Sequence, residues 1–277
     1  MLFSVLMSVY YGDKPEDVAT ALDSLLLQQL PPNQIVLVLD GPISEKMCET
    51  VKIYADANPI IDVIPLKTNV GLGKALGIGL TYCKYEYIAR MDSDDYSLPD
   101  RFKKQTEFLE KHPDIDILGG QITEYDADMK SVLAVRNVPL NMEEIAERMK
   151  TRNAMNHVTV IYKKDAVLSA GNYLHCPYFE DYYLWCRMIK NGNTFHNLSD
   201  NLVNVRTGEK MYQRRGGQTY NRAIIEFQKK IRELGFISHT QYMKNLCIRL
   251  CVANMPNSLR AYLYKTKLRA KHEEQHA

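Results

Sequence analysis

The chain has 277 residues, of which 45% are hydrophobic and 25% are charged, and its formal net charge is +2. That length suits one sizeable α/β domain, or a domain with an extension, at roughly 100–200 residues per domain. The small net charge argues against nucleic acid as a partner, and no apolar run approaches the roughly 20 residues that span a bilayer.

The N-terminal segment has the composition of a strand. Residues 1–13 lack the basic stretch and the small-residue cleavage site of a signal peptide. The six cysteines include no CxxC pair, which leaves zinc-ribbon and thioredoxin-like sites without support. We therefore expect a cytoplasmic protein with reduced thiols.

Short apolar runs alternate with segments of helical periodicity through residues 1–118. This alternation predicts an α/β fold with a mostly parallel, Rossmann-like sheet covered by helices on both faces, and such sheets bind ligands at the carboxyl ends of their strands. The expected strands are Leu2–Val9, Ile35–Leu39, Ile60–Ile64 and Tyr87–Met91, and the expected helices are Val18–Leu27, Ser44–Ala55, Lys74–Cys83 and Arg101–Lys111.

The alternation becomes less regular in residues 119–235. We expect one domain over residues 1–235, made of halves 1–118 and 119–235, followed by a basic helical extension over residues 236–277. The expected elements of the second half are helices at Glu143–Thr151, Lys164–Ala170, Phe179–Asn191 and Gln218–Leu234, with a strand at Val158–Tyr162.

An acidic cluster directly follows the fourth predicted strand. Asp92, Asp94 and Asp95 lie within four residues, and crowded carboxylates repel each other unless a cation joins them. Mg²⁺ or Mn²⁺ would fit, because alternate residues of an extended chain face the same side and these ions take few carboxylates plus phosphates. The alternative is a solvated acidic turn.

Two further strand ends carry candidate ligand groups. Asp40 precedes Gly41 and Pro42, so it either accepts a hydrogen bond from a nucleotide or forms a simple turn. The glycine-rich stretch Asn69–Lys74 precedes a helix, where free N–H groups could face an anion. It matches neither the P-loop nor the GxGxxG motif.

Glu180 and Asp181 open a helix whose next turn holds the chain's single tryptophan, Trp185. A carboxylate at the rim of an aromatic pocket is partly desolvated, which raises its pKa and suits a general base. The alternative is that both acids complement the dipole of the helix.

In order, SVYYGD, VLVLDGP, NVGLGKALGIGL, ARMDSDDYSLPDRFKKQ, GNY and FEDYYLW resemble the family 2 glycosyltransferases with the GT-A fold. The resemblance covers roughly residues 1–235 and is greatest to bacterial enzymes that build O-antigen, capsule or exopolysaccharide. It implies an inverting, metal-dependent transfer of a hexose or N-acetylhexosamine from a UDP-sugar. The acceptor would be a lipid-linked or oligosaccharide glycan.

The resemblance also implies roles for individual residues. Asp40 would contact the uracil, and Asp92 and Asp94 would form the DxD pair that binds Mn²⁺ or Mg²⁺. Asp181 would be the base, supported by Glu180. The donor site would further include Ser8, Tyr10, Lys74, Arg90 and Ser93, and the acceptor side would include His157, Glu180 and Trp185.

The chain departs from the family pattern at two places. Many relatives carry two acids before the glycine, whereas here Leu39 precedes Asp40. The QxxRW motif of processive synthases is absent, and residues 213–217 stand in a comparable place. We hypothesise that Arg214 or Arg215 closes over the diphosphate, since a guanidinium suits phosphate; the alternative is a solvated basic loop.

The basic, amphipathic segment from Ser238 onward either contacts the inner leaflet of the membrane peripherally or packs on the domain. Two other functions compete with sugar transfer. A sugar nucleotidyltransferase would carry a glycine- and arginine-rich loop after the first strand, which Tyr10–Pro15 is not. A non-catalytic nucleotide-sugar-binding module would not need the acids at 92–95 and 180–181.

Overall fold

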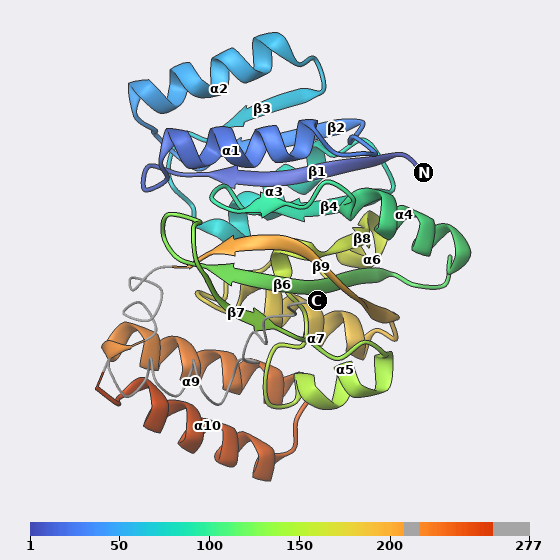
Figure 1. Ribbon diagram of the computed structural model, residues 1–277. Coiled ribbons are helices and arrows are strands. Elements are labelled where there is room, and N and C mark those ends of the chain that lie inside the picture. Colours follow the sequence, from blue (N-terminus) through green and yellow to red (C-terminus); the bar gives the residue numbers. More distant parts are fainter. Residues whose placement is uncertain (208–215, 257–277) are drawn as a thin grey trace.

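The computed structural model describes residues 1–207 and 216–256, which fold around one mixed sheet (Figure 1). Its strand order is β3-β2-β1-β4-β8-β6-β9-β5, and β7 pairs with β6. The strands are β1 Phe3–Val9, β2 Gln34–Leu39, β3 Ile61–Pro65, β4 Tyr87–Met91, β5 Tyr96–Ser97, β6 Ile117–Tyr125, β7 Val132–Arg136, β8 Ile161–Lys163 and β9 Phe195–Arg206.

Strands β1 to β4 are parallel to one another, which confirms the parallel half predicted from the sequence. β8 runs antiparallel to both β4 and β6, and it joins this half to the rest of the sheet. β6 and β9 are again parallel. The fold is therefore mixed α/β, with its parallel strands in two groups.

Helices cover both faces of the sheet, as expected, because successive side chains of each strand point to opposite sides. In β1, Leu6 packs with one group of helices, whereas Val5 and Met7 pack with the other. The first group is α3 Leu72–Tyr82, α5 Met142–Met149, α6 Lys164–Ser169, α7 Glu180–Lys190, α9 Gly217–Glu233 and α10 His239–Ala253; the second is α1 Pro15–Leu26, α2 Glu45–Ala57 and α4 Arg101–Lys111.

The second half differs from its prediction. β6, β7 and β9 were not expected, and the predicted strand Val158–Tyr162 is a 3₁₀-helix, η1 His157–Thr159, followed by the short β8. β9 carries polar residues, and burial along it is irregular, so it lacks the apolar signature of a covered strand. β6 is buried nearly throughout, but Gly119, Gly120 and Gln121 interrupt its apolar run.

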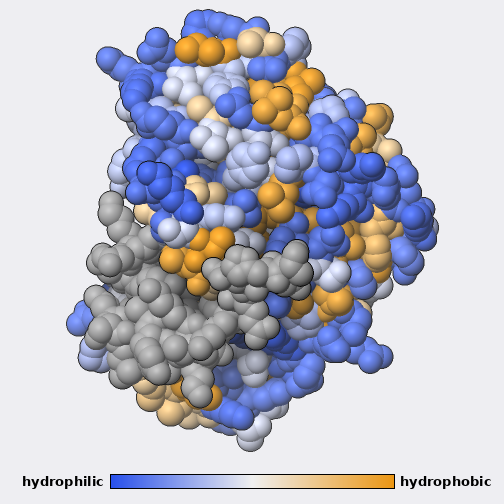
Figure 2. Space-filling model, viewed as in Figure 1, coloured by the Kyte–Doolittle hydropathy of each residue, from blue (hydrophilic) through white to orange (hydrophobic). Residues whose placement is uncertain are grey.

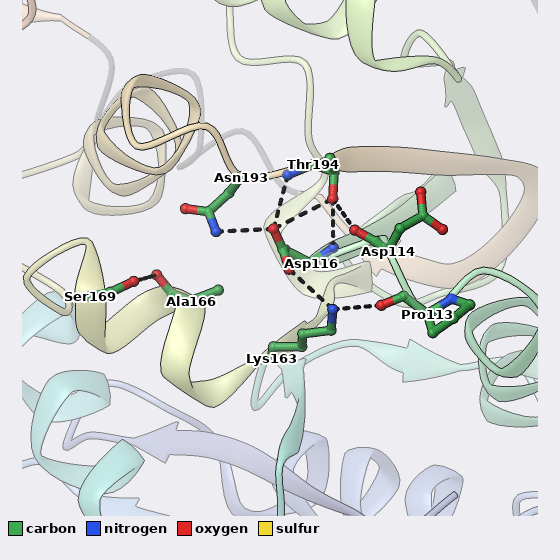
Figure 3. Close-up of polar contacts among 8 residues, drawn as sticks. All are labelled: Pro113, Asp114, Asp116, Lys163, Ala166, Ser169, Asn193 and Thr194. Atoms are coloured by element: carbon green, nitrogen blue, oxygen red, sulfur yellow. Dashed lines mark hydrogen bonds and ion pairs between the residues drawn. The ribbon is translucent and has the colours of Figure 1, made fainter.

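A polar cluster fixes the edge opposite the predicted ligand-binding ends (Figure 3). Asp116, just before β6, accepts hydrogen bonds from Thr194 N at 3.0 Å and Asn193 Nδ2 at 3.0 Å, and Lys163 Nζ lies 3.2 Å from its other oxygen. Lys163 Nζ also donates to the carbonyl of Pro113 at 2.7 Å. The cluster thus ties together the starts of β6 and β9 and the end of β8.

Helix α10 packs on the domain as a hairpin with α9, which is the packed alternative for residues 239–253 (Figure 1). Within the described ranges no helix is both long and apolar enough to cross a membrane. On the face in Figure 2, apolar residues form separate groups among hydrophilic ones. The rest of the basic extension, residues 257–277, lies outside the described part of the chain, so its predicted membrane contact stays a prediction.

Two glycines of α3 give a matched test of its packing on the sheet. A Cβ at Gly79 would lie 2.5 Å from Val38 Cγ2 and 2.6 Å from Leu6 Cδ1, whereas at Gly77 the nearest atoms are 3.5 Å away. We expect Gly79→Ala to lower the free energy of unfolding by about 1–3 kcal/mol through overpacking. Gly77→Ala should be neutral or stabilising by up to about 1 kcal/mol, because alanine favours a helix. Urea unfolding of both variants checks this; equal effects would contradict it.

Candidate active site

The acidic loop lies at the carboxyl end of β4, directly after Met91. Arg90, the fourth residue of β4, is 1% exposed, and its guanidinium forms an ion pair with Asp92. Burial alone would lower the pKa of Arg90, but the charge and hydrogen bond of Asp92 together with the charges of Tyr173 and Asp95 outweigh burial, so the pKa is raised. Arg90 is therefore a permanent cation beneath the loop.

The loop gathers more negative charge than its own sequence suggests. Asp13, from the turn after β1, accepts hydrogen bonds from Ser93 Oγ at 2.9 Å and from Tyr10 N at 3.0 Å. Desolvation, followed by the charges of Asp92 and Asp13, raises the pKa of Asp94 to about 6. Ser93 thus contacts Asp13, and Asp13 joins the site although the sequence analysis did not select it.

Arg206, at the end of β9, holds the other side of the loop. Its N–H donates to Asp95 Oδ1 at 2.8 Å, its Nε donates to the carbonyl of Asp94 at 3.1 Å, and Nη2 lies 3.0 Å from Asp17 Oδ1. Asp95 is 3% exposed, and burial together with the charges of Asp92 and Asp94 raises its pKa well above the usual value. Arg206 was missed because β9 was not predicted.

The two acidic motifs, far apart in sequence, converge on one cavity of about 200 Å³. Asp92 reaches it from the end of β4 and Asp181 from the first turn of α7. The cavity is lined by Asp92, Asp95, Ile122, Glu124, Arg136, Met155, Asn156, His157, Val158, Asp181, Val205 and Thr207. The structure thus brings together residues predicted for the donor, the base and the acceptor, although Asp94 is not among the lining residues.

Asp181 has a defined partner. Asn153 Nδ2 donates to its Oδ2 at 2.7 Å. Burial raises the pKa of Asp181, while hydrogen bonds from Tyr182 N and Asn153 and the charges of Arg136 and Arg90 oppose that rise. A carboxylate that is partly desolvated yet oriented by a fixed amide has the properties of a general base.

Glu180 points to a different neighbour. An added Cβ at Gly73, in the first turn of α3, would lie 2.7 Å from Glu180 Cγ, so the two elements touch there. Desolvation by burial raises the pKa of Glu180 to about 7. Glu180 therefore lies between the base and the start of α3, and it does not line the cavity.

His157 lines the cavity and is held from behind by Tyr173, whose hydroxyl lies 3.0 Å from Nε2. Burial and the positive charge of Arg90 lower the pKa of His157 well below its usual value, so the ring is neutral. The prediction that Trp185 contacts the acceptor is wrong. Its side chain is 0% exposed and packs edge-on against His157 and Phe195, so it cannot contact an acceptor directly.

Asp40 also needs a correction. It is 2% exposed, and its two carboxylate oxygens accept from Val70 N at 2.7 Å and Gly71 N at 3.0 Å. The glycine-rich stretch had suggested N–H groups free for an anion, but these two are bound to Asp40. Asp40 fixes the loop before α3, and its side chain leaves almost no surface that a uracil ring could contact.

The remaining donor-site candidates lie near the same strand ends. Ser8 is half-buried near the end of β1, Tyr10 is 37% exposed just beyond it, and Lys74 is exposed in the first turn of α3. Their predicted contacts with a nucleotide stay predictions. Arg214 and Arg215 fall outside the described residues.

The acid loop could hold a divalent cation whose remaining coordination positions are filled by a bound phosphate ligand. Across residues 1–207 and 216–256, no group of three His, Cys, Asp or Glu side chains is arranged to hold a metal ion. Yet the pKa of Asp94 is raised in part by its like-charged neighbours, so a cation would relieve repulsion there. Mg²⁺ or Mn²⁺ held by one or two carboxylates plus phosphate oxygens suits such a site.

A model of the family "Glycosyl transferase family 2" matches residues 4–170, more than half of the chain. The chain belongs to glycosyl transferase family 2. "Amylovoran biosynthesis glycosyltransferase AmsE" of Erwinia amylovora is 38% identical over 267 residues, covering 95% of this chain and 98% of that protein. "UDP-Gal:alpha-D-GlcNAc-diphosphoundecaprenol beta-1,3-galactosyltransferase" of Escherichia coli is 30% identical over 267 residues, covering 96% of each.

Among solved structures, S. aureus TarS 1–349 in complex with UDP-GlcNAc superposes with a TM-score of 0.64 at 20% identity, covering 99% of this chain and 78% of that one. The likeness shows that this glycosyltransferase has the GT-A fold. Family membership also decides between the three functions left open by the sequence: the chain is a glycosyltransferase, not a nucleotidyltransferase or a non-catalytic module.

The raised pKa of Glu180 predicts a pH-dependent stability difference. The folded protein holds this proton more tightly than the unfolded chain, so its stabilising contribution is present at low pH and is lost as the pH rises from 4.5 through about 7. At pH 8, Glu180→Gln should therefore be more stable than the parent by on the order of 2 kcal/mol. The difference should shrink toward pH 4.5.

Thermal or urea unfolding at several pH values measures this difference. The same substitution at exposed Glu143 reports the general effect of removing a negative charge. A Glu180→Gln variant that is less stable at pH 8, or equally shifted at every pH, would contradict the desolvated position of Glu180.

Proposed function

We propose that this glycosyltransferase moves a hexose or N-acetylhexosamine, with inversion, from a UDP-sugar to a lipid-linked glycan during bacterial surface polysaccharide synthesis. The observation that carries the proposal is the convergence of Asp92 and Asp181 on one cavity. A nucleotide-holding acid and a desolvated base must act on the same substrate pair, and a shared cavity is the arrangement that this chemistry needs.

The proposed reaction is a direct displacement at the anomeric carbon. The acceptor hydroxyl oxygen forms a bond to that carbon while the bond from the carbon to the UDP oxygen breaks. Asp181 takes the hydroxyl proton, and UDP leaves with the bonding electron pair. Asn153 keeps the carboxylate oriented for this step, and Arg136, which also lines the cavity, favours its charged form.

The departing diphosphate gathers negative charge, so cations must lie near it. Asp92 and Asp94 would hold Mn²⁺ or Mg²⁺ together with the diphosphate, and the ion would supply charge neutralisation to the leaving group. The buried Arg90 holds Asp92 in place through its ion pair. His157, a neutral ring in the cavity wall, can donate or accept a hydrogen bond on the acceptor side.

The choice of donor and acceptor class has support from the relatives. The printed name of the E. coli relative specifies UDP-Gal and a diphosphoundecaprenol acceptor, and that of the Erwinia relative specifies amylovoran biosynthesis. Since both relatives match the chain nearly from end to end, we extend the UDP-sugar donor and the lipid-linked acceptor to this enzyme. Peripheral contact with the cytoplasmic face of the inner membrane would then bring the enzyme to its acceptor.

Asp181→Asn tests the base. The amide keeps the shape of the side chain but cannot take a proton, so turnover should fall by about 10²–10⁴-fold. UDP binding should be unchanged, because the substitution leaves the acid loop intact. Asp165→Asn is the matched control, since Asp165 is also a first-turn acid but lies on α6, away from the cavity. Near-normal turnover in Asp181→Asn would remove the assignment.

The metal and nucleotide are tested together by thermal stability. UDP with Mn²⁺ should raise the melting temperature, since a ligand at 100 times its dissociation constant adds about 2.7 kcal/mol. UMP, which lacks the second phosphate, should stabilise less, and Asp94→Asn should lose the part that depends on Mn²⁺. Equal stabilisation by UDP in the presence of EDTA would refute the metal-bridged site.

A further inference from the structure

Three consecutive backbone carbonyls at the end of α5 are held by side chains from other helices. Tyr182 Oη, on α7, donates to the carbonyl of Met149 at 2.6 Å. Asn245 Nδ2 and Arg249 Nη2, both on α10, donate to the carbonyls of Lys150 at 2.8 Å and Thr151 at 2.7 Å. The last carbonyls of a helix have no partner within it, so these donors fix where α5 ends.

The segment fixed in this way leads directly to the base. Asn153 follows Thr151 by two residues, and it contacts Asp181 through Nδ2 at 2.7 Å. Its own Oδ1 accepts from Met155 N at 3.1 Å, and its carbonyl accepts from Arg136 Nη2 at 3.3 Å. Asn153 is thus held directly by Met155 N and Arg136, and the residues just before it are held by α10.

The α10 donors are themselves firmly placed. Asn245 is only 5% exposed, and it lies four residues before Arg249, so both side chains leave the same face of α10. The guanidinium of Arg249 lies 5.7 Å from the ring centroid of Tyr182 and 5.8 Å from those of Phe179 and Phe227. A cation among three aromatic rings has little freedom to move away from its carbonyl.

We propose that Asn245 and Arg249 are positioning residues for catalysis: through the end of α5 they set the place of Asn153, and hence the orientation of Asp181. The inference rests on the proposed role of Asp181 as the base. It assigns the C-terminal helix α10 a role in orienting the proposed base.

Loss of these donors has a predictable chemical consequence. Without them Asn153 is less well placed to donate to Asp181, and this hydrogen bond lowers the pKa of the carboxyl. The charges of Arg136 and Arg90 also lower the pKa of Asp181, but they come from β7 and β4 and do not depend on α10. Losing the α10 donors should therefore raise the pKa of Asp181 by less than the loss of all the groups that lower it.

The experiment measures kcat against pH, with saturating UDP-sugar and acceptor, for Asn245→Ala, Arg249→Met and Asn153→Ala. Methionine keeps the apolar stem of arginine and removes the donor. We expect kcat to fall roughly tenfold and the acidic limb to move up by about one pH unit in each variant, since an ordered base is worth that much. Met243→Ala is the control, because that side chain is 52% exposed on the same helix.

A double-mutant cycle separates positioning from a general loss of stability. If α10 acts through Asn153, adding Arg249→Met to Asn153→Ala should change neither kcat nor the acidic limb of the pH profile any further. If the two residues act independently, their effects should add. UDP binding should be unchanged in all variants. An unmoved acidic limb in both Asn245→Ala and Arg249→Met, or full additivity with Asn153→Ala, would overturn the inference.

The outcome is distinct from failure of the proposed function. If Asp181→Asn retains turnover, the base assignment fails and this inference fails with it. If Asp181→Asn is inactive while the α10 variants keep the parental pH profile, only the inference fails. Should Arg249→Met not fold, Asn245→Ala and its double variant with Asn153→Ala carry the same test.

Discussion

The ion pair between buried Arg90 and Asp92 is the constraint on which the acidic edge of the sheet depends. Asp13, Asp92, Asp94 and Asp95 crowd together there, and their mutual repulsion helps to raise the pKa values of Asp13, Asp94 and Asp95. Arg90 supplies positive charge from below, where water cannot screen it. A buried cation that lost its carboxylate would be left uncompensated, so loop and strand stabilise one another.

This balance is incomplete, which is consistent with the cation proposed for the loop. Arg90 pairs with Asp92 on one flank of the loop. On the other flank, the backbone N–H of Arg206 donates to Asp95 Oδ1 and its Nε donates to the carbonyl of Asp94, while its guanidinium pairs with Asp17 of α1. The carboxylate of Asp94 stays in a field of like charges from Asp92 and Asp13. Desolvation and the charges of Asp92 and Asp13 raise its pKa to about 6, so added positive charge is favourable there.

The parts of the site that could be predicted are those that leave a local signal. Asp92 was selected because it follows a clear apolar strand, and Asp181 because an aromatic helical turn follows it. Asp13 ends the segment SVYYGD but was given no role, since its contact with Ser93 arises only when β1 and β4 become neighbours. Arg206 lies on β9, whose polar residues hide the strand. Trp185 was misplaced because sequence puts it one turn from Asp181 but cannot show that this turn enters the core.

The same limit applies to the division between residues 1–235 and 236–277. Composition changes there, because the extension is basic and amphipathic, and a boundary at Gly235 is the natural reading of that change. Contacts cross this boundary. Ile237 and Ala253 are buried in the main core, and Asn245 and Arg249 donate to carbonyls of residues 150 and 151, before the boundary. Those carbonyls precede Asn153, the hydrogen-bond partner of Asp181 in the cavity, so α10 is linked to that cavity through this segment. No residue of α10 lines the cavity, but α10 binds the segment that ends at Asn153, the hydrogen-bond partner of Asp181.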